Sequence, residues 1–143
     1  MIGKKGVYVI KVMLLFTFSK EHSFSVKEIS GRLGISEKVL EQVLLSLTRA
    51  KLLLSKRGPG GGYTLARDIS ELSIKELLGI TGNYLEGMPV DQKRKKWLID
   101  DVVCGIERGV EENLSGFLGR LKIKDLVAGM NEKIAKTRLS YII

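Results

Sequence analysis

Cysteine and histidine each occur once in this 143-residue chain, as Cys104 and His22. A single thiol excludes an internal disulfide framework and any zinc site made of paired cysteines. The two residues lie far apart in the sequence and no carboxylate pair stands out, so no nucleophile and base can be assigned. We therefore expect no enzyme and no metal site, and we interpret His22 as a polar surface residue.

Long apolar runs are also missing. The apolar stretch from Val7 to Phe18 is interrupted by Lys11, and no small-residue cleavage site follows it. No later run approaches the roughly 18 apolar residues that a membrane-spanning helix needs. We therefore expect a cytoplasmic protein with no membrane partner.

Positive charge is abundant, but it is concentrated in the first half of the chain. Residues 1–66 hold 11 Lys and Arg against 4 Asp and Glu, a net charge of +7, whereas residues 67–143 hold 13 against 12. Such an excess is typical of a surface that binds a polyanion, although many basic proteins bind none. The charge alone therefore leaves nucleic-acid binding undecided.

The first residues of the chain show the pattern of two helices. Apolar residues between Lys5 and Phe18 recur at helical spacing and predict a first amphipathic helix. Ser25 and Glu28 form a capping-box pattern that begins a short second helix, which we expect to end near Leu33.

Gly34 and Ser36 predict a turn and the start of a third helix. Glycine permits the left-handed conformation that ends many helices, and the serine can cap the helix that follows. The apolar stripe of the third helix, which we expect to face the core, is Val39, Leu40, Val43, Leu44 and Leu47. Two short helices joined through Gly-Ile-Ser make a helix-turn-helix, whose second helix enters the major groove of DNA.

The segment from Ser55 to Asp68 predicts a β-hairpin. Four of the five residues 58–62 are glycine, which excludes a helix and favours a flexible tip between two short extended arms. A phosphate-binding nucleotide loop is the alternative, but its Gly-Lys-Ser/Thr ending and the following helix start are missing. We interpret the hairpin as the wing of a winged helix-turn-helix.

The second half of the chain predicts a short helix, a loop and a long helix. Ser73 and Glu76 form another capping-box pattern, which opens a helix to about Ile80. Residues 81–89 are interpreted as a loop, and a long helix follows from about Trp97. The apolar residues that recur every three or four positions along it are Ile99, Val103, Ile106, Val110, Leu114, Phe117 and Leu121.

A helix of about 25 residues is roughly 37 Å long, which is more than a winged helix of this size can cover. Pairing with the same helix of a second chain would bury its apolar face, and we expect the first six of those residues to form this dimer contact. Gly105 and Gly109 weaken a helix, so they indicate a close backbone approach. The alternative is that the helix folds back on its own domain.

These elements predict a mainly α-helical fold. We expect residues 1–80 to form a winged helix-turn-helix domain of three helices and a two-stranded β wing. Residues 81–96 then form a loop or linker, and residues 97–143 form the dimerisation helix and a C-terminal helical segment.

Outward side chains of the third helix and the wing can recognise DNA. Gln42 can pair with adenine, Lys38 can reach guanine or a phosphate, and Glu41 can accept a hydrogen bond from cytosine. Glu41 is otherwise an ordinary surface charge, because phosphates repel a carboxylate. In the wing, Lys56 and Arg57 flank a narrow tip that can approach the backbone or enter a minor groove.

Phosphate contacts are expected at both ends of this surface. Arg49 and Lys51, at the end of the third helix, are candidate clamps, and Lys4 and Lys5 add two more from the first helix. The residues that we expect to contact DNA are Lys4, Lys5, Ser36, Lys38, Glu41, Gln42, Arg49, Lys56, Arg57 and Gly60.

Residues 26–68 resemble the family of winged-helix regulators that includes the iron–sulfur cluster regulator IscR, the nitric-oxide sensor NsrR and the cysteine-metabolism repressor CymR. The most specific matches are Leu40-Glu41-Gln42 and the run RGPGGGY that begins at Arg57. Gly6 with Tyr8, and the run SGFL that begins at Ser115, extend the likeness to most of the chain.

The resemblance implies a cytoplasmic homodimer that is crossed through the long helix and binds an imperfect palindrome near promoters. It also implies that Glu41 and Gln42 recognise bases and that Arg57 enters a minor groove. Cluster-binding members of that family carry three closely spaced cysteines just before and at the start of the long helix, whereas residues 82–103 here contain none.

One cysteine cannot hold an iron–sulfur cluster within a single chain, because such clusters are normally bound by several thiolates. We therefore expect no cofactor. Cys104 is either a redox-sensing thiol, able to pair across a dimer, or a small buried hydrophobic residue beside Val103.

Together these patterns predict a sequence-specific regulator of transcription, a repressor that acts as a homodimer on a palindromic operator in double-stranded DNA. Its signal would be a small effector, a thiol modification or a regulatory partner protein. The alternative is a cluster-free protein-interaction module, controlled by a partner protein and with little DNA binding. That alternative does not explain why Lys38, Gln42, Lys56 and Arg57 occur together.

Overall fold

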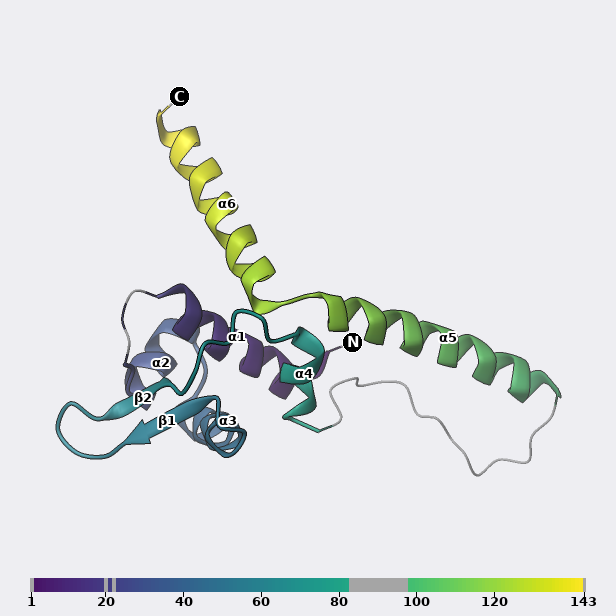
Figure 1. Cartoon of the computed structure of the whole chain (residues 1–143), viewed down its shortest axis with the longest axis horizontal. Coiled ribbons are helices and arrows are strands. Elements are labelled where there is room, and N and C mark those ends of the chain that lie inside the picture. The colour runs from purple at the N-terminus through teal and green to yellow at the C-terminus, as the bar shows by residue number, and fades with distance from the viewer. Residues whose placement is uncertain (1, 20, 22, 83–97, 143) are drawn as a thin grey trace.

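The computed structural model describes residues 2–19, 21, 23–82 and 98–142. These residues form a mainly helical fold with a two-stranded wing, as the sequence predicts. The elements in chain order are α1 (Lys4–Phe18), α2 (Val26–Leu33), α3 (Glu37–Arg49), β1 (Leu53–Lys56), β2 (Gly62–Leu65), α4 (Ile74–Gly79), α5 (Leu98–Arg120) and α6 (Ile123–Ile142). Helices α1 to α4 and the hairpin gather into one body, from which α5 and α6 project in different directions (Figure 1).

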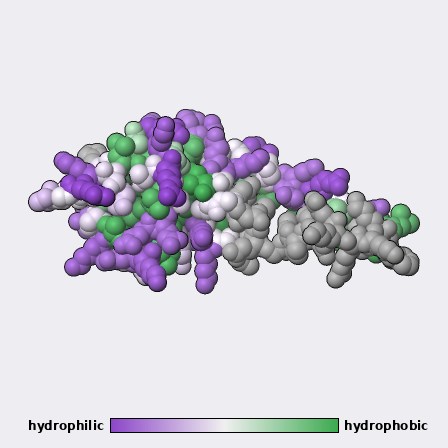
Figure 2. All heavy atoms as spheres, turned by 90° about the horizontal axis from the view of Figure 1, so that it is seen from below, coloured by the Kyte–Doolittle hydropathy of each residue, from purple (hydrophilic) through white to green (hydrophobic). Residues whose placement is uncertain are grey.

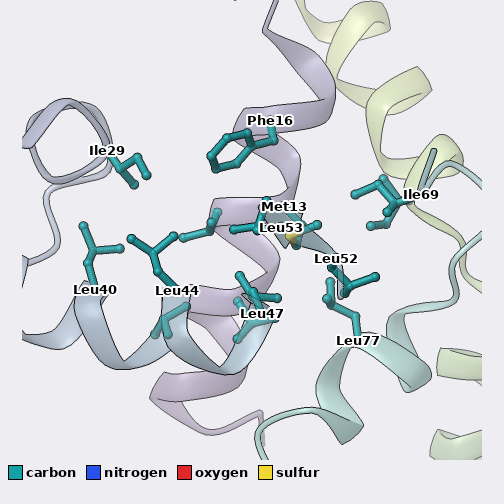
Figure 3. Close-up of a cluster of buried hydrophobic side chains, with 14 of the residues drawn as sticks. Met13, Phe16, Ile29, Leu40, Leu44, Leu47, Leu52, Leu53, Ile69 and Leu77 are labelled. Carbon is teal, nitrogen blue, oxygen red and sulfur yellow. The ribbon is translucent and has the colours of Figure 1, made fainter. Parts of the chain in front are cut away.

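The core of this body is apolar and lies where α1, α3 and α4 meet. Met13 and Phe16 of α1 lie close to Leu44 and Leu47 of α3 and to Leu77 of α4 (Figure 3). All five side chains are at most 4% exposed. Burying each of them stabilises the fold by about 1.5–3 kcal/mol relative to leaving it in water.

The helix-turn-helix has the local structure that the sequence predicts. The backbone N–H of Glu28 donates to the Ser25 hydroxyl and the N–H of Ser25 donates to the Glu28 carboxylate, both at 3.1 Å. Gly34 has a φ of +67°, and the Ser36 hydroxyl accepts a hydrogen bond of 3.4 Å from the N–H of Val39. Both helices therefore begin at side-chain caps, and glycine supplies the left-handed turn between them.

One residue of the predicted apolar stripe on α3 does not face the core. Leu40, Val43, Leu44 and Leu47 are at most 5% exposed, whereas Val39 is 39% exposed. At about 100° per residue, Val39 lies about 90° from the centre of the buried arc and falls at its edge. The expectation for Val39 is therefore wrong, because the other four side chains already span the buried face.

The wing is held against the start of α2 through its backbone. The N–H of Phe24 donates to the carbonyl of Tyr63 (3.0 Å), and the N–H of Tyr63 donates to the carbonyl of Phe24 (2.8 Å). A Cβ atom at Gly62 would lie 2.6 Å from the carbonyl oxygen of Phe24, which is closer than real Cβ contacts come. Glycine at position 62 is therefore required by this close approach.

Helix α3 ends in a backbone motif that normally contains glycine. The N–H of Lys51 donates to the carbonyl of Thr48, and the N–H of Leu52 donates to the carbonyl of Leu47, both at 3.0 Å. These are the two hydrogen bonds of a Schellman motif. Lys51 has a φ of +60°, the one positive φ of a non-glycine residue among those described. A residue with a Cβ atom pays about 1–2 kcal/mol for this left-handed conformation.

Replacing Lys51 with glycine should raise the free energy of unfolding by about 1 kcal/mol, because glycine adopts the left-handed conformation without this strain. Urea titration followed by circular dichroism measures the change. Lys51→Ala is the matched control, since it removes the charge but keeps the Cβ atom and should change stability little. A glycine variant no more stable than the alanine variant would show that position 51 stores no strain.

The turn between α5 and α6 is anchored to the segment before α4. The N–H of Ile123 donates to the carbonyl of Leu72 (3.0 Å), and the N–H of Ile74 donates to the carbonyl of Leu121 (2.8 Å). Ile123 is fully buried, and Leu118 at the end of α5 is 3% exposed. The two long helices are therefore attached to the winged-helix body at this joint.

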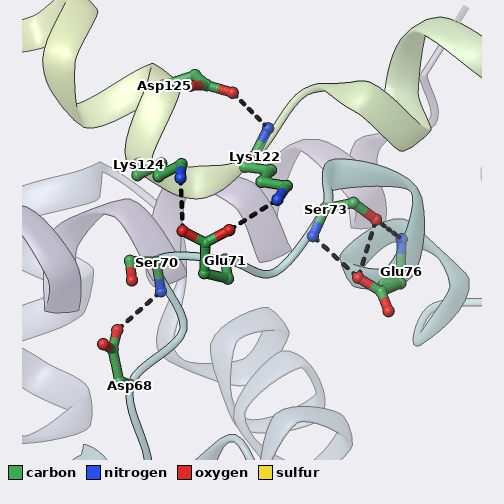
Figure 4. Close-up of polar contacts among 8 residues, drawn as sticks. All are labelled: Asp68, Ser70, Glu71, Ser73, Glu76, Lys122, Lys124 and Asp125. Carbon is green, nitrogen blue, oxygen red and sulfur yellow. Dashed lines mark hydrogen bonds and ion pairs between the residues drawn. The ribbon is translucent and has the colours of Figure 1, made fainter.

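Glu71 adds two ion pairs to the same joint (Figure 4). One carboxylate oxygen accepts a hydrogen bond of 2.7 Å from Nζ of Lys122, and the other oxygen accepts one from Nζ of Lys124. These hydrogen bonds lower the pKa of Glu71 from its usual 4.5 to about 2. The folded chain therefore favours the ionised carboxylate.

Because the pKa of Glu71 is depressed by folding, its contribution to stability is complete above about pH 4.5 and is lost as the pH falls towards about 2. Thermal melts of the original chain and of Glu71→Gln should differ most near neutral pH and should converge as the pH falls from about 4.5 towards about 2. The control is Glu132→Gln on α6, whose carboxylate forms no ion pair within the described residues. A difference in melting temperature that does not change with pH would contradict the role of this carboxylate.

Candidate nucleic-acid interface

The outer face of α3 is a ridge of exposed side chains. At about 100° per residue, Lys38, Gln42, Leu45 and Arg49 lie along one line opposite the buried face. All four are exposed, as is Glu41 beside them. These five residues define the ridge. All but Leu45 carry hydrogen-bonding or charged groups of the kind that recognise base edges.

A groove of about 720 Å³ runs beside the ridge. Its walls come from three elements, namely Lys5 of α1, the outer side of α3, and Ile80 and Thr81 after α4. The lining residues of α3 are Lys38, Val39, Glu41, Gln42, Val43, Leu45, Ser46 and Arg49. The structure thus brings Lys5 together with the DNA contacts predicted on α3.

The wing places two more of the predicted contacts at a narrow tip. Lys56 ends β1 and Arg57 begins the tip, and both side chains are exposed. The N–H of Gly61 donates to the carbonyl of Gly58 (2.8 Å), which closes a tight turn. Gly60 in this turn has a φ of +72°. Three of the four residues 58–61 are glycine, so the backbone of this turn can approach another molecule closely.

The cationic side chains of the ridge and wing are not neutralised by the protein itself. Within the part of the chain that the structure describes, Lys38, Arg49, Lys56 and Arg57 form no ion pair. Figure 2 views the molecule from below Figure 1, the side of α3 and the wing, and its winged-helix half is largely hydrophilic. These charges are therefore free to meet phosphates.

The other predicted contacts lie at the edges of this surface, and one ridge residue was not predicted. Lys4 is exposed at the start of α1, and the exposed Ser36 caps α3. Sequence reasoning missed Leu45, which is 49% exposed. Its spacing, seven residues after Lys38 and three after Gln42, was the available signal, because residues so spaced share a helix face.

Helix α5 presents an apolar stripe to solvent. Its exposed members, which range from 47% to 81% exposed, are Leu98, Ile99, Val102, Val103, Ile106, Val110 and Phe117. Leu114, also predicted for the dimer contact, is partly buried against the core. The described part of α5 therefore does not fold back on its own domain along this stripe. A Cβ atom added at Gly105 or Gly109 would meet no atom within 4 Å beyond the neighbouring helix backbone.

Cys104 does not belong to the exposed stripe. The residue is of intermediate exposure, and it lies two positions before Ile106, or about 160° around the helix. The thiol is therefore on the opposite side of α5 from the stripe. This position counts against a thiol pair formed through contact between two such stripes.

Two predictions fall outside the described residues. They are the surface position of His22 and the loop or linker over residues 81–96, of which only Thr81 and Gly82 are described. Among the helices that are described, none is long and apolar enough to cross a membrane.

Known proteins similar to this chain are regulators of transcription. The HTH-type transcriptional regulator IscR of Serratia proteamaculans (strain 568) is 30% identical over 139 residues, which cover 96% of this chain and 85% of the relative. IscR of Klebsiella pneumoniae (strain 342) is 31% identical over 128 residues, which cover 88% and 78%.

Solved structures show the same fold. T. potens IscR has a TM-score of 0.72 at 27% identity, covering 93% of this chain and 90% of that one. Staphylococcus aureus CymR has a TM-score of 0.69 at 23% identity, covering 87% and 96%. The likeness includes the winged helix and the long C-terminal helices.

A family model called Rrf2, described as an iron-dependent transcriptional regulator, matches residues 2–129. The donors of this chain do not fit an iron–sulfur cluster, because Cys104 supplies its one thiolate. The described residues also contain no group of three or more His, Cys, Asp or Glu side chains that could hold a metal ion. The family model's description names iron, but the described residues of this chain contain no set of ligands that matches it.

The match to the family model, the curated relatives and the solved structures agree with the winged helix-turn-helix fold described above. They also agree that the protein is a regulator and not an enzyme. The chain belongs to the Rrf2 family of winged helix-turn-helix transcriptional regulators.

Proposed function

We propose that this regulator is a homodimeric repressor that binds a palindromic operator in duplex DNA. The observation that carries the proposal is the exposed ridge of α3, which includes Lys38, Gln42 and Arg49. Helix α3 lies next to the narrow, basic wing (Figure 1). A helix that follows a tight turn and presents such side chains has the size and the chemistry to enter a major groove.

The residues in the middle of the ridge recognise the bases. Gln42 pairs with the N6 and N7 edge of an adenine, and Glu41 accepts a hydrogen bond from the amino group of a cytosine. Lys38, one turn earlier, reaches a guanine or a phosphate. Ser36 stands at the N-terminus of α3, where exposed backbone N–H groups favour a phosphate.

Phosphate and minor-groove contacts surround this centre. Arg57 enters a minor groove, while Lys56 and the close backbone approach at Gly60 hold the neighbouring strand. Arg49 at the end of α3 binds a phosphate on one side. Lys5, which lines the same groove, binds a phosphate on the other side, and its exposed neighbour Lys4 adds charge.

The exposed stripe of α5 forms the dimer. Ile99, Val103, Ile106 and Val110 of one chain pack against the same residues of its partner. Gly105 and Gly109, at the flank of the stripe, leave room for the two backbones to approach. Two copies related by a two-fold axis present two α3 ridges, which is why the operator is a palindrome. Leu114 and Phe117 extend the contact towards the body.

The repressor acts in the cytoplasm without a cofactor. The absence of a cofactor is supported by the single cysteine, because one thiolate in each chain is too few to bind an iron–sulfur cluster. Its signal is then a small effector, a thiol modification or a regulatory partner protein that alters the dimer or the ridge.

Selection of genomic fragments with the purified protein should return a palindromic operator, and binding should weaken steeply with salt. Each neutralised phosphate adds about 0.9 to the slope of log affinity against log salt. Fluorescence anisotropy measures this slope for the original chain and for Arg57→Ala, which should lose affinity about tenfold or more. The control is Arg120→Ala, which removes an exposed arginine from the end of α5.

A flat salt response would contradict DNA binding through phosphates. Equal affinities for Arg57→Ala and Arg120→Ala would contradict the role of the wing. A stable dimer that selects no operator would instead support the protein-interaction module.

Ile106→Glu should convert the dimer into a monomer, because pairing would bury two unpaired carboxylates at the centre of the stripe. We expect the dimer dissociation constant to rise by more than about 100-fold, as measured by analytical ultracentrifugation. Arg108→Glu introduces the same charge on the opposite side of α5 and should leave the dimer intact. If both variants remain dimeric, the stripe is not the dimer contact.

A further inference from the structure

Leu45 is an apolar side chain at the centre of a surface that is otherwise polar. The other leucines of α3, Leu40, Leu44 and Leu47, are fully buried, whereas Leu45 is 49% exposed. Its place on the helix is midway around the outer face, on the line that joins Gln42 to Arg49. A single exposed leucine is common on protein surfaces, so its location and not its exposure calls for an explanation.

The surroundings of Leu45 favour a nucleic acid over a protein partner. Lys38, Arg49 and Lys5 line the same groove, and within the described residues none of the three forms an ion pair. A partner protein that covered Leu45 would bury these cations, whereas the phosphates of a duplex would neutralise them. The charge around the leucine therefore selects DNA as the occupant.

A major groove offers one apolar group to such a side chain. The exposed edges of adenine, guanine and cytosine present hydrogen-bond donors and acceptors, whereas thymine adds a 5-methyl group. Helical side chains lean towards the preceding turn, so the isobutyl group of Leu45 lies over the turn that carries Glu41 and Gln42. Contact with a thymine methyl would thus fall next to the base that Gln42 recognises.

We propose that Leu45 is a specificity-determining residue that packs on the 5-methyl group of a thymine in the major groove, beside the base pair recognised by Gln42. The inference rests on the proposed function and deepens it. It adds an apolar contact to a face on which only hydrogen bonds and charges were expected. Each half-site of the operator then contains one thymine whose methyl group contributes to affinity.

Deoxyuridine tests this directly, because it differs from thymidine by the 5-methyl group alone. Each thymine of the selected operator is replaced singly, at the same position in both half-sites, and affinity is measured by fluorescence anisotropy. For the original chain, one position should weaken binding about fourfold per methyl group removed, or about 15-fold for the pair. Leu45→Ala should bind the thymine and uracil operators equally.

The matched control is Leu54→Ala, which truncates a leucine that is 58% exposed on β1. This variant should still distinguish thymine from uracil as the original chain does. The proposal is overturned if no uracil substitution weakens the original chain, or if Leu45→Ala keeps the discrimination. In both cases steep, salt-dependent operator binding would persist, whereas its absence would mean that the proposed function itself has failed.

Discussion

The backbone of Phe24 exchanges hydrogen bonds of 3.0 and 2.8 Å with Tyr63 at the root of the wing. Its buried ring packs edge-to-face on Phe16 of α1, with centroids 5.1 Å apart, and the guanidinium of Arg32 at the end of α2 lies 5.0 Å from the ring centroid. An isolated two-stranded hairpin is marginally stable in water, so the wing depends on such contacts for a defined position. The place of Arg57 relative to the ridge of α3 is therefore set largely at Phe24.

The same body explains why α5 is left with an apolar stripe. The core of the body is formed by α1 to α4 and by Ile123 at the joint. Among the described residues of α5, those that pack on this core lie at its C-terminal end, around Leu118. The rest of α5 extends beyond the body (Figure 1). Because the joint sets the direction in which α5 leaves, it also sets the separation of two DNA-binding bodies in any dimer formed through that helix.

Local chemistry made much of the fold predictable. The capping pair Ser25 and Glu28 and the left-handed Gly34 depend on residues within one helical turn, so short sequence patterns were enough to place α2 and its ends. Lys51 escaped prediction because its left-handed conformation follows from the direction in which β1 must leave α3, and lysine carries no signal for it. Phe24 was missed because its partners come from segments far apart in the sequence.

The amino-acid sequence by itself determined the winged helix-turn-helix, the wing and the basic, polar character of α3, because caps, glycines and helical periodicity act over a few residues. Only the tertiary structure decided which side of each helix is covered. It exposed Val39 and Leu45, and it left Ile99, Val103 and Ile106 of α5 exposed. Periodicity shows that a helix has an apolar side, but burial depends on which other element lies against that side, and that is a property of the whole packed chain.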